Sequence, residues 1–182
     1  MINYINIKQK LEFMKLKEAL KKLNDDVAFK QYLKDSPKTF LSHFFMMKGE
    51  QKQDWQIGYY NPDTNLVSTY LVTSKEITTE TPQEPFKKPG DKVLGLDFDK
   101  VKLDYDEAME IANKCLKEKY SKALVSKTMI ILQNIREIGN VWNITFITLS
   151  LDTINIRINS DDGNVISHEK QSLIEKMPGL KK

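Results

Sequence analysis

Hydrophobic and polar residues alternate most regularly between Val141 and Lys170. Side chains of one set are large or apolar: Trp142, Ile144, Phe146, Thr148, Ile154, Ile156 and Ile158. Those between them are mostly polar, including Asn143, Thr145, Asn155, Arg157 and Asn159. A period of two indicates strands with one buried face and one solvated face. Asp162-Gly163 lies between the last two strands, and glycine there supplies the positive φ of a two-residue turn. We therefore predict a three-stranded antiparallel meander, closed by a strand that starts at Val165.

Four more strands and two helical regions are predicted outside this meander. The strands are Thr39–Lys48, Asp54–Tyr60, Leu66–Thr73 and Leu124–Ile135. Leu16, Leu20, Leu23 and Val27 recur at helical spacing in Ile7–Lys34. This region reads as two pieces broken at Asn24–Asp26, with Asn24 or Asp25 capping the second. A second helix starts at Asp104, because Asp104 and Glu107 have the spacing of a capping box. Its apolar stripe contains Ala108, Ile111, Ala112, Cys115 and Leu116.

The middle of the chain marks a boundary between two halves. Ser74–Gly90 contains three prolines and reads as a linker or a long surface loop. Val93–Val101 is predicted to be irregular or a short edge strand. Each half has a helix, an apolar strand, a polar turn and then a Trp-x-Ile-x-aromatic strand, at Trp55 and at Trp142. Two copies of one unit, residues 1–90 and 91–182, explain this pattern, and so does chance similarity between two antiparallel halves.

Composition narrows the class of protein. The chain has 28 basic and 25 acidic residues, a net charge of +3, and only two arginines. Dispersed lysines do not read base edges, so we expect no nucleic-acid partner. No apolar run is long enough to span a membrane, and the charged N-terminus does not read as a signal peptide. The chain as it stands predicts a cytoplasmic protein, whereas a leader removed before expression would place it outside the cell or at the envelope.

The second half, from about Leu103 to Lys170, resembles the PepSY family. The matching segments are DEAMEIANKCLKE, like the family's opening helix, then VWNITF, and then INIRINSDDGNVISHE, with Gly163 at the corner glycine. The resemblance implies an α+β fold of the cystatin-like kind, in which antiparallel sheets each pack against a helix. It also implies a non-catalytic module without a cofactor that binds or restrains a peptidase. The first half has the Trp strand but no Asp-Gly corner, so it would be a divergent copy.

No catalytic or metal-binding constellation stands out. His43 lies within an apolar strand and reads as a hydrogen-bonded sheet histidine, whereas His168 follows the last strand and reads as exposed. Cys115 lies on the apolar stripe of its helix without a residue spaced to activate it, so it reads as core. The acidic residues around Asp104 lack the turn glycine of a calcium loop. We therefore expect no enzyme activity, no cofactor and no metal.

Two functions remain in view. The first is a regulatory module that binds a polypeptide on a sheet face or edge, with Tyr59, Tyr60 and Tyr70 as anchors and a polar row of Asn143, Asn155 and Arg157. The same residues would also suit an ordinary solvated sheet. The second is a carrier of a small apolar ligand in a cavity between helix and sheet. The sequence specifies neither the partner nor the oligomeric state.

Overall fold

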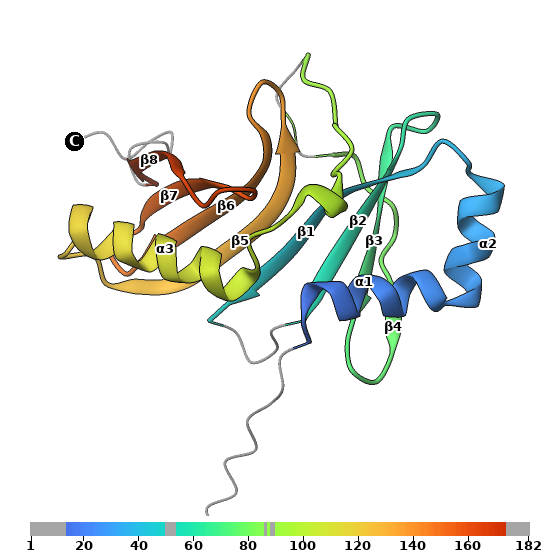
Figure 1. Ribbon diagram of the computed structural model, residues 1–182, viewed down its shortest axis with the longest axis horizontal. Coiled ribbons are helices and arrows are strands. Elements are labelled where there is room, and N and C mark those ends of the chain that lie inside the picture. Colours follow the sequence, from blue (N-terminus) through green and yellow to red (C-terminus); the bar gives the residue numbers. More distant parts are fainter. Residues whose placement is uncertain (1–13, 50–53, 86, 88–89, 174–182) are drawn as a thin grey trace, which may run out of the picture.

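Eight strands form one antiparallel sheet in the computed structural model of the protein, which describes residues 14–49, 54–85, 87 and 90–173 (Figure 1). The strands are β1 (Phe40–Lys48), β2 (Trp55–Asn61), β3 (Leu66–Val72), β4 (Ile77–Thr79), β5 (Val125–Ile135), β6 (Gly139–Thr148), β7 (Asp152–Asn159) and β8 (Val165–Ser172). Their order across the sheet is β4-β3-β2-β1-β5-β6-β7-β8. Each half of the chain therefore supplies a four-stranded meander, and pairing of β1 with β5 joins the halves into one sheet.

The described residues form three α-helices beside the sheet: α1 (Leu16–Asp25), α2 (Val27–Asp35) and α3 (Tyr105–Lys119). Helices α1 and α3 lie along the same face of the sheet (Figure 1). The break between α1 and α2 falls where predicted, but the cap is Asp26, whose Oδ1 accepts a hydrogen bond from the Phe29 amide at 2.8 Å. Prediction of Asn24 or Asp25 as the cap was wrong, and Val27, just beyond the break, is exposed instead of continuing the apolar stripe. The predicted helical residues before Met14 lie outside the described part of the chain.

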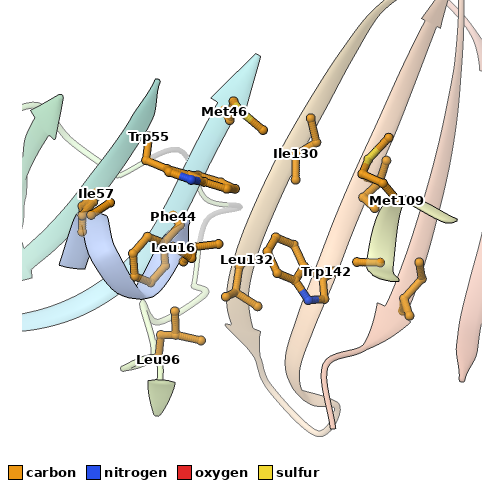
Figure 2. Packing of buried hydrophobic residues seen from close by; sticks show 14 of the residues in the cluster. Leu16, Phe44, Met46, Trp55, Ile57, Leu96, Met109, Ile130, Leu132 and Trp142 are labelled. Atoms are coloured by element: carbon orange, nitrogen blue, oxygen red, sulfur yellow. The ribbon is translucent and has the colours of Figure 1, made fainter. Parts of the chain in front are cut away.

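One hydrophobic core lies between the helices and the sheet. The two tryptophans are fully buried in it, with ring centroids 6.4 Å apart, and Phe44, Ile130 and Leu132 lie around them (Figure 2). The alternation predicted for the meander is confirmed, because Trp142, Ile144, Phe146, Thr148, Ile154, Ile156 and Ile158 are all buried. Because residues of both halves belong to this one cluster, the core spans the junction between them.

Both tryptophans tie their strand to the chain just before a helix. The Trp55 indole Nε1–H donates to the carbonyl of Met14 at 3.0 Å, and that of Trp142 donates to the carbonyl of Leu103 at 3.1 Å. Each acceptor immediately precedes the N-cap residue of its helix, Lys15 for α1 and Asp104 for α3. The indoles therefore fix where α1 and α3 begin relative to the sheet.

The N-termini of α1 and α3 are also closed alike. The Glu107 carboxylate accepts from the Asp104 amide at 2.9 Å, and the Asp104 carboxylate accepts from the Glu107 amide at 3.0 Å. The predicted capping box is thus confirmed. In α1 the Glu18 carboxylate accepts from the Lys15 amide at 3.1 Å. Because a lysine side chain cannot accept, α1 keeps only this half of the box.

The described residues between β3 and α3 pair with the sheet and do not form a free linker. This segment contains β4, and the Val67 and Gln83 backbones exchange two hydrogen bonds of 2.8 and 3.0 Å farther along the edge of β3. It then reaches the ends of β1 and β5, where the Leu96 amide donates to Leu41 and the Asn134 side chain donates to Gly95. Leu96 enters the core, and a short 3-10 helix, η1 (Phe98–Lys100), follows in place of an edge strand.

The turn between β7 and β8 is longer than predicted. Gly163 has the expected positive φ of 75°, but residues 160–164 form the loop, and its ends are closed by the Asn159 amide donating to the Asn164 carbonyl at 2.9 Å. The Ser160 carbonyl accepts from the amides of Lys102 and Leu103 at 3.0 and 2.8 Å. The extra residues thus connect this corner of the sheet to the chain entering α3.

Candidate polypeptide-binding surface

The sheet face opposite α1 and α3 is called here the open face. Cross-strand pairing places Leu71, Gln56, Phe45, Ile131, Asn143, Arg157 and Ser167 in one continuous row on it, from β3 to β8. A second row contains Met47, Met129, Thr145, Asn155 and Glu169. Because side chains alternate along strands, these residues point away from the core that holds the tryptophans.

The centre of the open face is apolar. Phe45 and Met47 of β1 face Ile131 and Met129 of β5, and all four are partly buried. Both strands come from dense apolar runs, FFMM and MIIL, in which consecutive residues supply both faces of the sheet. Sequence reasoning missed this patch, although an apolar run without alternation is typical of a strand covered on both faces.

A hollow of about 780 Å³ lies between the open face and the chain that follows β4. Its floor is formed by the sheet, including His43, Phe45, Ile131 and Gln133. The residues that close its other side are Gln83, Glu84, Pro85, Lys87, Asp91, Lys92, Val93 and Leu94. Arg136 and Arg157, the only arginines of the chain, also line it. This volume falls within the range of natural binding pockets.

His43 is held in one orientation on the floor of the hollow. Ser42 Oγ donates to the Gly58 carbonyl at 2.9 Å and lies 2.9 Å from His43 Nδ1. Because the Ser42 hydroxyl proton is donated to the Gly58 carbonyl, the Ser42 oxygen can only accept from His43, so His43 Nδ1–H is the donor. Burial lowers the pKa of His43 to about 4, so the imidazole is neutral at physiological pH. The prediction of a hydrogen-bonded sheet histidine is confirmed.

Gly58 is required beneath the His43 ring. A Cβ added to Gly58 would overlap the imidazole and lie 2.6 Å from Nδ1. Glycine therefore occupies this position because the ring lies against the backbone, and not because of its own φ. The His43 ring therefore packs directly against the backbone of β2.

The polar row predicted from the sequence lies at one side of the open face. The Asn155 side-chain Nδ2 donates to Asn143 Oδ1 at 2.7 Å and to Thr145 Oγ1 at 2.8 Å. Asn143 lies directly opposite Arg157 in the β6–β7 pairing. Arg157 Nε is buried without a hydrogen-bond partner among the described residues, and leaving such a donor unpaired costs about 1–3 kcal/mol.

The three tyrosines predicted as anchors do not join this row. Tyr59 and Tyr70 are buried on the helix side, where the Phe29 ring of α2 packs against both, at centroid distances of 4.8 and 5.0 Å. Burial raises the pKa of Tyr59 to about 12, and burial also raises that of Tyr70. Tyr60 belongs to the opposite face, but it is buried against Phe40 and donates to Asn65 Oδ1 at 2.9 Å. Their prediction as surface anchors is therefore corrected.

The remaining reactive side chains lie apart from the open face. His168 is exposed and its Nδ1 lies 2.9 Å from the Tyr120 hydroxyl beyond the end of α3. Cys115 is buried in α3, and burial raises the pKa of its thiol. Among the described residues no three His, Cys, Asp or Glu side chains gather as a metal site would require.

Comparison with known proteins relates the chain to others through its fold. No family model matches the sequence, and no curated protein matches it either. The crystal structure of a "putative lipoprotein" from Clostridium difficile 630 superposes with a TM-score of 0.53. It is 16% identical in sequence, and the match covers 79% of this chain and 90% of that one. Within the described residues, no helix is long and apolar enough to cross a membrane. The superposition with that crystal structure indicates that this chain and the lipoprotein share an α+β fold.

Proposed function

We propose that the protein is a non-catalytic regulatory module that binds a polypeptide on the open face of its sheet. The observation that carries this proposal is the apolar patch of Phe45, Met47, Ile131 and Met129 at the centre of that face, on the side away from the packed helices. Patches of apolar side chains bordered by polar ones are typical of interaction sites. The row of Asn143, Asn155 and Arg157 provides such a border.

A carrier of a small apolar ligand between helix and sheet fits less well. That interface is occupied by large buried side chains, among them Trp55, Trp142, Phe29, Phe44 and Phe146. The hollow lies on the other face and has Arg157, Arg136 and Gln133 in its lining. Apolar ligands are bound in pockets with few polar groups, so the observed arrangement favours a polypeptide.

We also propose that the protein consists of two tandem units that resemble PepSY domains. The support is a two-fold relation about the Phe45–Ile131 pair. In the first half Phe45 lies opposite Gln56 and Phe44 opposite Ile57, and in the second half Ile131 lies opposite Asn143 and Ile130 opposite Ile144, so the two meanders have the same register. Exchange of the halves takes Trp55 to Trp142, each in the second strand of its meander and each bonded to the residue before an N-cap. The binding patch would then be built equally by both units.

The resemblance to PepSY domains makes a peptidase the first partner to consider. We propose a location at the envelope, with which the description of the structural neighbour as a lipoprotein is compatible. Fractionation of the source organism, followed by detection of the protein with an antibody, tests the location independently of binding.

A photo-crosslinking amino acid introduced in place of Met129 tests the proposed function. The matched control carries the same amino acid at Glu110, which is exposed on α3. In extracts of the source organism we expect a discrete protein adduct from position 129 and none from position 110. Absence of an adduct at 129, or the same adducts from both positions, would contradict binding on the open face.

A further inference from the structure

We infer that Arg157, which lines the hollow, and Asn143, which lies opposite it on the open face, together bind a carboxylate of the bound polypeptide. This inference rests on the proposed function and adds the chemistry of the partner. Among the described residues, the buried Arg157 Nε has no hydrogen-bond partner and the Arg157 guanidinium forms no ion pair. A guanidinium presents donors in a rigid planar fork that fits both oxygens of a carboxylate.

Asn143, the residue directly opposite Arg157, supplies a second donor. Asn143 uses its Oδ1 to accept from Asn155, which leaves the Asn143 Nδ2 group without a partner among the described residues. Asn143 and Arg157 lie directly opposite each other on adjacent strands, so their Cβ atoms are about 5 Å apart. An acceptor with two oxygens can therefore bind to both side chains at once.

The charges around the hollow favour the same ligand. Lys87, Lys92, Arg136 and Arg157 line it, against two acidic residues, Glu84 and Asp91. Neither acidic side chain forms an ion pair with either arginine in the described structure. Because His43 is neutral, the excess positive charge comes from lysine and arginine and is independent of pH in the physiological range.

The position of the apolar patch sets the spacing in the partner. Ile131 and Arg157 occupy the same cross-strand row and are separated by β6 alone, which corresponds to about 10 Å. An extended chain advances about 3.3 Å per residue. A segment that crosses the strands would thus place an acidic residue about three positions from an apolar residue seated on Ile131 and Phe45.

Peptides that bind the complete folded chain, selected from a random library, serve as probes of the carboxylate site. Peptides that bind the wild type but not a Met129→Lys variant are sequenced, and their affinities are measured with Asp or Glu replaced by Asn or Gln. We expect an acidic residue about three positions from an apolar one. We also expect the amide isostere to bind about 10- to 100-fold more weakly, the usual effect of a hydrogen bond to a charged group.

Variants of the protein assign the effect to Arg157. Arg157→Gln should bind the acidic peptide as weakly as the wild type binds its isostere and should no longer distinguish the two. Arg157→Lys should recover part of the loss, and Lys114→Gln on α3 removes the same charge as a control without effect. The isostere comparison uses only the wild type, so it remains valid if Arg157→Gln does not fold.

The outcomes separate this inference from the proposed function. Peptides that require Met129 but bind equally well as acid and amide would overturn the carboxylate site and leave the binding face intact. Discrimination that persists in a folded Arg157→Gln variant would also overturn it. Failure to select any peptide that depends on Met129 would overturn both proposals.

Discussion

Acidification should destabilise the protein through His43. Burial lowers the pKa of this imidazole to about 4, against 6.5 in an unfolded chain. The unfolded chain therefore binds more protons than the folded one between these pH values, and the free energy of unfolding falls as the pH drops below 6.5. The full difference between the two pKa values corresponds to about 3 kcal/mol, and about 2 kcal/mol of it is lost between pH 7.5 and pH 5.

Urea unfolding at a series of pH values measures this loss. A His43→Asn variant can keep a donor near Ser42 but does not titrate, so the charged groups that line the hollow contribute alike to both proteins. We expect the free energy of unfolding of the wild type to fall about 2 kcal/mol more than that of the variant over this interval. Parallel pH profiles would refute burial of a neutral His43.

Three further substitutions test the packing. Gly58→Ala should cost about 1–3 kcal/mol in free energy of unfolding, because the new methyl group overlaps His43, and a second change of His43 to Ala should recover much of that loss. Trp142→Ala should cost about 3–5 kcal/mol, measured by urea unfolding, and a cost below 1 kcal/mol would contradict its place in the core. Asp26→Ala should cost about 1 kcal/mol, whereas Asn24→Ala should leave thermal stability unchanged.

Local patterns were sufficient to predict most elements of the fold. Strict alternation placed Trp142, Ile144 and Phe146 on the buried face, and the spacing of Asp104 and Glu107 located the start of α3. Each of these signals acts within a few residues of the chain, so it can be read without knowledge of the partner strand. The tandem arrangement and the PepSY resemblance stay proposals.

What the sequence did not predict depends on contacts between distant segments. β4 is three residues long, Ile77–Thr79, and becomes a strand only because β3 offers a free edge. Tyr59 lies two residues from Ile57 in β2, so the alternation of side chains along a strand places both on the buried face. The prediction of Tyr59 as a surface anchor instead rested on the frequency of tyrosine at binding sites. The hollow requires β1, β5 and the chain after β4 to meet, which no local pattern encodes.

Methionine methyl NMR tests the central claim, that a polypeptide binds on the open face, most directly. Met46 and Met47 are adjacent in β1 but face opposite sides of the sheet, and Met109 and Met129 form a similar contrast between α3 and β5. On titration with a selected peptide we predict that the methyl signals of Met47 and Met129 shift, while those of Met46 and Met109 stay in place. Shifts confined to Met46 and Met109, or no shift at Met47 and Met129 at saturating peptide, would contradict the account.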